Sequence, residues 1–105
     1  MLHINNNTKM NFILEALPLD AATRIGDIIA DASEVANQDW PNSWTPEKTG
    51  DLTIKEFEDF LVDMIDARDL NEEDFHADTK DENLIRFHRF ADILEGNTFR
   101  ETIIV

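Results

Sequence analysis

Cysteine is absent from the chain, and glycine occurs only three times in its 105 residues. Without cysteine there is no disulfide, no thiolate zinc site and no cysteine nucleophile, and such a composition fits a reducing compartment. Gly26, Gly50 and Gly96 are too far apart to form a glycine-rich loop that cradles phosphate groups. Several common kinds of catalytic and nucleotide-binding site are thereby excluded.

Basic residues and long apolar segments are also scarce. Nine Lys and Arg stand against 23 Asp and Glu, which gives a formal net charge of -14. Such a charge repels nucleic acids and anionic membranes, so neither is predicted as a direct partner. No apolar run approaches the roughly 18 residues of a membrane span, and the N-terminus lacks a signal-like stretch. We therefore expect a cytoplasmic protein.

The apolar content is nevertheless high enough for folding. Leu, Ile, Val and Phe make up 30 of the 105 residues, well above the roughly 20% below which highly charged chains stay disordered. A chain of this length supports one modest core and not two. The sequence therefore predicts a single acidic globular domain over residues 1–105.

Two segments predict a small sheet. Residues 10–17 form a short apolar run that Pro18 closes, and its length favours a strand. Residues 98–105 are rich in β-branched side chains and indicate a second, terminal strand. We expect the two strands to pair with each other, because a lone strand leaves its backbone groups unmatched.

Three longer segments have apolar residues at helical spacing, and each has a recognisable start. Asp20 can cap the first segment, while Thr53 with Glu56 and Thr79 with Glu82 have the spacing of capping boxes. The fold class is therefore α+β and mostly helical, with an all-α bundle as the alternative. A short helical turn is also predicted near 72–77, and Gly26 is expected to permit close packing of the first helix. The predicted apolar stripes are Ile25, Ile28, Ile29, Ala32, Val35 and Ala36; then Phe57, Phe60, Leu61, Met64 and Ile65; then Leu84, Phe87, His88, Ala91 and Leu94, which Ile85, Phe90 and Ile93 widen.

Carboxylates recur three and four residues apart on the polar faces of the first two helices. Residues 51–82 contain 13 of the 23 acidic residues and only Lys55, Arg68 and Lys80 as Lys or Arg. Like charges at this spacing destabilise a helix, so local stability gives no reason for such stripes. Along a helix they advance about 4.5–6 Å, a pitch that a groove built to bind phosphates can tolerate. The candidate partner-binding acids are Asp27, Asp31 and Glu34 on the first helix, and Asp59, Asp63, Asp66, Asp69, Glu72 and Glu73 on and after the second.

Trp40 and Trp44 lie in a proline-containing segment between the first two helices. One interpretation is a lid that folds over the core. The other is a partly exposed aromatic anchor beside an acidic face, which would give a binding surface the durable affinity that charge alone does not.

Motifs for catalysis or metal binding are weak. In the segment 45–56, residues 49–57 resemble the second half of an EF-hand loop, with Gly50 at its sixth and Glu56 at its twelfth position, but the first half has too few carboxylate ligands and contains Pro46. His76 has no second histidine at ligand spacing, and His88 is expected to be a half-buried residue of the third apolar stripe. No serine lies in a nucleophile-elbow motif. We predict neither an enzyme nor a cofactor or metal site.

These observations favour an acidic inhibitor that imitates the phosphate charge of nucleic acid and blocks a basic nucleic-acid-binding protein of a host. In composition and size the chain resembles phage-encoded DNA mimics that act against restriction enzymes or CRISPR effectors. No motif matches one such family, so no residue roles are transferred. The alternative is a cytoplasmic interaction or immunity-type module that neutralises one basic partner protein. Oligomeric state is left open.

Overall fold

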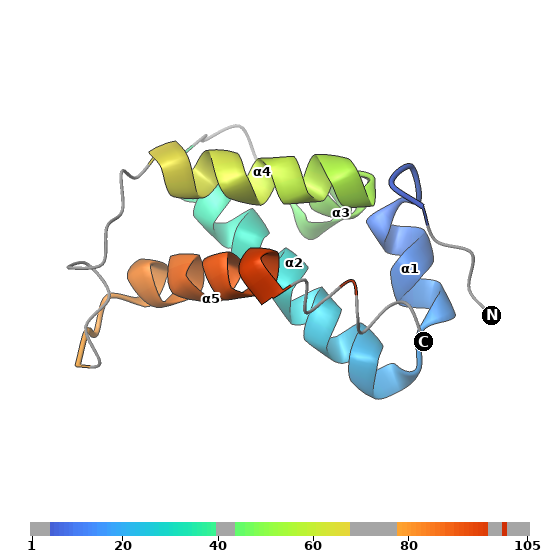
Figure 1. Ribbon diagram of the computed structural model, residues 1–105, viewed down its shortest axis with the longest axis horizontal. Helices are drawn as coiled ribbons and strands as arrows, with labels where there is room; N and C mark the ends of the chain where they lie inside the picture. Colours follow the sequence, from blue (N-terminus) through green and yellow to red (C-terminus); the bar gives the residue numbers. More distant parts are fainter. Residues whose placement is uncertain (1–4, 40–43, 68–77, 97–99, 101–105) are drawn as a thin grey trace.

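The computed structural model describes residues 5–39, 44–67, 78–96 and Arg100. Within these residues the chain is helical and contains no strand, so the predicted α+β class is wrong and the all-α alternative is correct. Figure 1 shows α4 and α5 running in opposite directions, with α2 crossing behind them and α1 at one end. The helices are α1 (Met10–Ala16), α2 (Leu19–Asp39), α3 (Pro46–Gly50), α4 (Ile54–Ala67) and α5 (Glu82–Gly96).

The predicted N-terminal strand is helix α1. Met10 and Ile13 are fully buried, and Leu14 and Leu17 pack against the core from the next turn. These positions follow the i, i+3, i+4, i+7 pattern of a helix. Phe12 is 56% exposed, so it extends the apolar run in the sequence without belonging to the buried face. Because Phe12 fills the gap between Met10 and Ile13, the apolar residues form a short continuous run that is typical of a strand.

Instead of the sheet expected between the two ends of the chain, the described residues contain a single isolated backbone bridge. Lys9 and Thr53 form an isolated antiparallel bridge, and the backbone N–H of Met10 donates to the carbonyl of Leu52 at 2.9 Å. The bridge fixes the start of α1 against the start of α4. The predicted strand at 98–105 lies outside the described residues except for Arg100, which has helical geometry.

The starts of α2 and α5 differ from the sequence prediction, whereas the start of α4 agrees with it. Thr53 and Glu56 exchange side-chain-to-backbone hydrogen bonds of 3.1 and 3.2 Å, which confirms that capping box. Helix α5 is capped by Asp81 instead of Thr79, because the Asp81 carboxylate accepts from the N–H groups of Asn83 and Leu84. Asp20 lies inside the first turn of α2, where its charge still suits the helix dipole.

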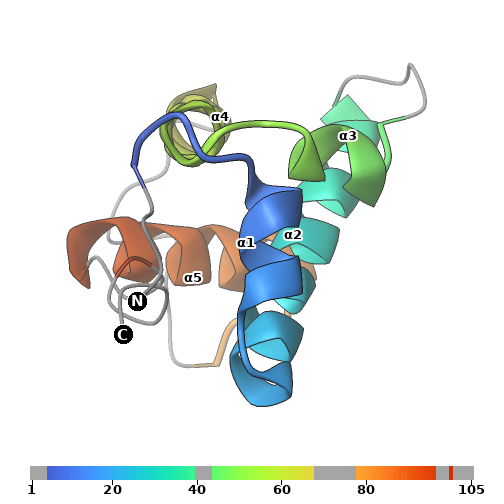
Figure 2. The same ribbon diagram turned by 90° about the vertical axis from the view of Figure 1, so that its right-hand side faces the viewer.

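The core joins four of the helices, and Figure 2 shows α1 and α2 side by side with α4 seen along its axis. Phe87 and Phe90 of α5 meet edge to face, with ring centroids 6.1 Å apart. The His88 side chain is exposed rather than half-buried, because the core-facing stripe of α5 runs through Phe87, Phe90 and Ile93. The buried apolar residues of this core are Met10, Ile13, Ile25, Ile29, Ala32, Val35, Ala36, Ile54, Phe57, Leu61, Met64, Phe87, Phe90 and Ile93.

Gly26 does not serve close packing. A Cβ placed on Gly26 would meet nothing within 4 Å, so the glycine weakens α2 without a steric benefit. We expect Gly26→Ala to raise the free energy of unfolding by about 0.5–1 kcal/mol, measured by urea denaturation. The reverse change at exposed Ala30 in the same helix, Ala30→Gly, should lower the stability by a similar amount. Lower stability of Gly26→Ala would mean that a neighbour occupies this space.

Candidate functional site

The outer side of α4 carries an exposed row of carboxylates. Asp59, Asp63 and Asp66, which we call the α4 acidic face, are all exposed. They lie on the opposite side of the helix from the buried Phe57 and Leu61. At a rise of about 1.5 Å per residue the three carboxylates extend over roughly 10 Å of helix axis. The helix therefore presents three negative charges in one direction.

Little positive charge compensates the α4 acidic face. Lys55 Nζ lies 2.9 Å from Asp59 Oδ1, and both side chains are about 60% exposed. The hydrogen bond to Asp59 and its negative charge raise the pKa of Lys55, against a smaller opposing effect of burial. In the part of the chain that the structure describes, no ion pair joins Asp63 or Asp66 to a cation. Among the described residues, Lys55 is thus the one cation that pairs with this face.

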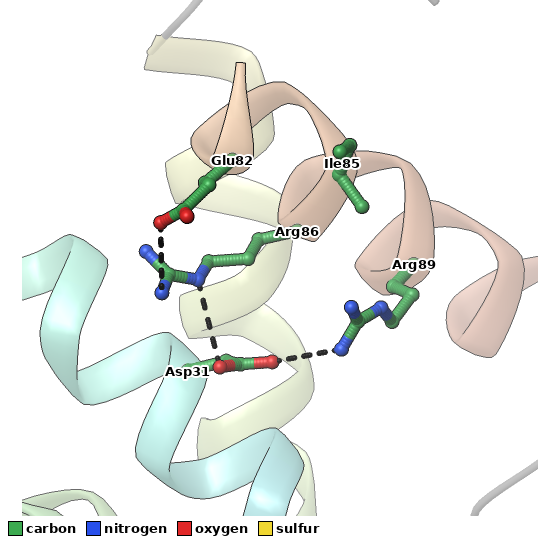
Figure 3. Close-up of a pocket in the computed structure, with 5 residues that line it drawn as sticks. All are labelled: Asp31, Glu82, Ile85, Arg86 and Arg89. Carbon is green, nitrogen blue, oxygen red and sulfur yellow. Dashed lines mark hydrogen bonds and ion pairs between the residues drawn. The ribbon is translucent and has the colours of Figure 1, made fainter. Parts of the chain in front are cut away.

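The acidic stripe of α2 has a different environment, because α5 packs across part of it. Asp31 accepts from Arg89 at 3.0 Å and lies 3.5 Å from Nε of Arg86, and Glu34 lies 3.1 Å from Nη2 of Arg86. Figure 3 shows the Asp31 carboxylate between the two guanidinium groups. Of the three predicted α2 acids, only Asp27 is exposed without an ion pair among the described residues.

Arg86 is the centre of this contact between α2 and α5. Its side chain is only 14% exposed and also lies 3.9 Å from the Glu82 carboxylate. Together with Arg89, Ile85, Asp31 and Glu82 it lines a polar hollow of about 250 Å³. Positive and negative groups are nearly balanced here. The contact therefore orients α5 on α2. It also pairs two of the candidate carboxylates, Asp31 and Glu34, with cations of the same chain.

Trp44 is half-buried and packs inward. Its ring stacks on Phe60 of α4 with centroids 5.1 Å apart and planes 8° apart. Its Nε1–H donates to Thr49 Oγ1 at 2.7 Å, and Thr49 Oγ1 lies 2.6 Å from Ser33 Oγ. Ser33 in turn donates to the carbonyl of Ile29 at 2.7 Å. This placement matches the lid interpretation for Trp44, while Trp40 lies outside the described residues.

Direction can be assigned along this hydrogen-bonded chain. Each hydroxyl has one proton, and the proton of Ser33 goes to the Ile29 carbonyl at 2.7 Å. Thr49 Oγ1 lies 2.6 Å from Ser33 Oγ and 3.3 Å from the Thr45 carbonyl, so Thr49 donates to Ser33 over the shorter contact and accepts from Trp44. Thr49 is fully buried and belongs to α3, whereas Ser33 belongs to α2. The chain of three side chains thereby links α2, α3 and, through the ring stack, α4.

Arg100 links α4 to the segment that precedes α1. It forms an ion pair with Glu58 and donates to the amide oxygen of Asn6 at 3.0 Å. The hydrogen bond with Glu58 raises the pKa of the Arg100 guanidinium, although partial burial acts in the opposite direction. Glu58 is therefore used inside the molecule, like Asp31 and Glu34.

The structure brings together only part of the predicted site. Asp59, Asp63 and Asp66 form one face, Asp31 and Glu34 meet α5, and Asp69, Glu72 and Glu73 lie outside the described residues. Sequence reasoning missed Arg86 and Arg89 as internal partners, although their spacing of three on one helix was visible. It also missed Thr49 and Ser33. The spacing of Ser33 could have indicated its hydrogen bond, because a serine in a helix can donate to the carbonyl four residues earlier, here that of Ile29.

A metal site and a membrane-spanning helix each have structural requirements with which the described residues can be compared. Across residues 5–39, 44–67 and 78–96, no group of three or more His, Asp or Glu side chains is arranged to hold a metal ion. The EF-hand-like segment forms α3 and the start of α4, and the Glu56 carboxylate accepts from the Thr53 N–H. No helix within the described residues has the length and apolar content needed to cross a bilayer.

Comparison with protein-family models, with curated proteins and with solved structures finds no match for this chain.

Proposed function

We propose that this chain is a cytoplasmic acidic decoy that occupies the nucleic-acid groove of a basic host protein and needs no chemical step. In composition and size, the proteins it most resembles are the phage inhibitors of restriction enzymes and CRISPR effectors. The α4 acidic face binds the Lys and Arg side chains that otherwise hold phosphate groups. Asp27 on α2 adds a further exposed carboxylate.

One observation carries the proposal: the two acidic stripes have different environments. The α2 stripe faces Arg86 and Arg89, whereas the α4 acidic face has Lys55 as its only cation among the described residues. An ordinary solubilising surface gives no reason to leave three like charges side by side on a helix, where they repel one another. A surface that binds a basic groove requires such a concentration of charge.

The spacing of the carboxylates fits this role. Asp59 and Asp63 are separated by about 6 Å along the helix axis, and Asp63 and Asp66 by about 4.5 Å. A DNA strand places a phosphate about every 3.4 Å of its axis, and two strands contribute. The flexible ends of Lys and Arg side chains accommodate the remaining difference. A rigid helix face therefore offers negative charge at a pitch close to that of the natural ligand.

Competition with nucleic acid tests the proposal. The chain, immobilised on beads, is exposed to a nuclease-treated bacterial lysate, and the bound proteins are eluted with a duplex of about 20 base pairs. We expect the duplex to release nucleic-acid-binding proteins, and binding to fall steeply between about 0.05 and 0.2 M salt, as it does for the phosphate contacts being imitated.

The alternative, an interaction module for one basic protein, predicts a different result. Its partner would remain bound in the presence of the duplex, because recognition would not take place in a nucleic-acid groove. Retention of every captured protein against both duplex and salt would contradict the decoy proposal.

A further inference from the structure

An apolar groove lies between α4 and α5, beside the α4 acidic face. It has a volume of about 200 Å³ and opens to the surface. Its floor is aliphatic and its edges are acidic. The lining residues are Val62, Ile65 and Asp66 from α4, and Ala91, Leu94 and Glu95 from α5.

The floor exposes apolar side chains that the core does not cover. Val62 is 42% exposed, and Ile65 and Leu94 are only partly buried where they pack against the core. A single exposed aliphatic residue is ordinary on a protein surface. Here, however, four aliphatic side chains from two helices share one depression, which is the form of a site that receives an apolar side chain.

The acidic residues at the edges of the groove favour an occupant with positive charge. Asp66 borders the groove on α4 and Glu95 borders it on α5, and both are exposed. Asp66 also belongs to the α4 acidic face, so the groove and that face form one continuous surface. An occupant must therefore combine an apolar side chain with cations on either side of it.

We propose that this groove receives an amphipathic helix of the basic partner, with an aliphatic residue in the depression and Lys or Arg next to Asp66 and Glu95. The inference rests on the proposed function and extends it, because it names the structural element of the partner that is bound. A second copy of the chain does not fit. Two chains of charge -14 each would bring their Asp66 and Glu95 carboxylates together around one apolar contact.

The groove supplies the apolar contacts that the α4 acidic face lacks. Long-range attraction mainly speeds encounter, while a long-lived complex needs desolvated apolar contacts. Trp44 does not provide them, because its ring stacks on Phe60 and its N–H is bonded to Thr49. The aliphatic floor between α4 and α5 is an alternative source within reach of the same carboxylates.

Two synthetic peptides test this inference. The first is a fluorescent helical peptide of about 18 residues, long enough to be helical, with leucines on one face and lysines on the other. The second has the same lysines and alanine in place of each leucine. Fluorescence anisotropy at about 0.15 M salt measures the two dissociation constants, and methyl NMR follows Val62, Ile65 and Leu94 during the titration.

We expect the full chain to bind the leucine peptide at least about tenfold more tightly than the alanine peptide, because one buried leucine contributes at least that much. The Val62→Asn variant should lose this preference. Ile85→Asn, which changes a similarly exposed (38%) aliphatic residue outside the groove, should keep it. The methyl signals of Val62, Ile65 and Leu94 should shift only with the leucine peptide.

The outcomes separate the groove from the acidic face. Equal affinity for both peptides, lost in an Asp59→Asn, Asp63→Asn, Asp66→Asn variant, would overturn the groove and leave the decoy proposal standing. No binding of either peptide would contradict both. A dimer that Val62→Asn converts to a monomer would assign the groove to a second copy and overturn the inference.

Discussion

Reversing the α4 acidic face, with Asp59→Lys, Asp63→Lys and Asp66→Lys in one chain, is expected to weaken binding to the basic partner at least about 100-fold. The partner is the protein captured and released by duplex DNA, and the dissociation constant is measured by surface plasmon resonance. The salt dependence of the remaining binding should be much smaller than that of the original chain.

The size of this effect follows from the number of charges that change. Each reversal replaces an attraction by a repulsion, and close charge pairs in interfaces couple by about 1.5 kcal/mol or more. Three such positions exceed the roughly 2.8 kcal/mol that corresponds to a 100-fold change. The three residues are exposed, so the helix itself should remain folded, as circular dichroism can verify.

A matched variant changes the net charge by the same amount elsewhere. Glu15, Asp20 and Asp78 are exposed and lie outside α4, and their replacement by lysine should weaken binding only a few-fold through the overall field. If both triple variants weakened binding equally, recognition would depend on total charge and the α4 acidic face would have no special role.

Removing the buried hydroxyl of Thr49 is expected to have the largest effect on stability. Thr49→Val keeps the volume of the side chain and eliminates the acceptor of the Trp44 N–H and the donor to Ser33. A buried polar group that loses its partner costs about 1–3 kcal/mol, so we expect the free energy of unfolding to fall by about 2 kcal/mol. In a domain of this size that corresponds to a melting temperature lower by about 10 °C.

The same substitution at an exposed threonine is the control. Within the part of the chain that the structure describes, the Thr23 hydroxyl hydrogen-bonds only to the Leu19 carbonyl of its own helix, at 2.9 Å, and Thr23 is exposed. Thr23→Val should change the stability by no more than about 0.5 kcal/mol. A Thr49→Val variant as stable as the unmodified chain would show that the link between α2, α3 and Trp44 contributes nothing to folding.

The contact of α5 with α2 changes how the net charge should be understood. Arg86 and Arg89 contact Asp31, and Arg86 also contacts Glu34, so these carboxylates hold two helices together. Salt bridges at exposed positions contribute little individually, but Arg86 is mostly covered and makes three such contacts. Of the described candidate acids, those that remain without a contact to α5 are Asp27 and the α4 acidic face.

Local sequence signals were sufficient for some elements and misleading for others. The capping box of Thr53 and Glu56 and the stripe of Phe57, Leu61 and Met64 predicted α4 correctly, because both depend on residues within one helix. Helix α1 was mistaken for a strand because exposed Phe12 filled a gap in its helical pattern. Helix α3 was missed since its five residues are too few for periodicity to show.

The sequence by itself determined the excess of carboxylates, the lack of cysteine chemistry and the amphipathic character of α2, α4 and α5, because composition and helical spacing are local properties. Only the tertiary structure decided which carboxylates are free. Asp31 and Asp63 have the same appearance in the sequence, but α5 brings Arg86 and Arg89 to Asp31 while no described cation pairs with Asp63. The physical reason is that the charge available to a partner depends on contacts between residues more than 50 positions apart, which no local pattern contains.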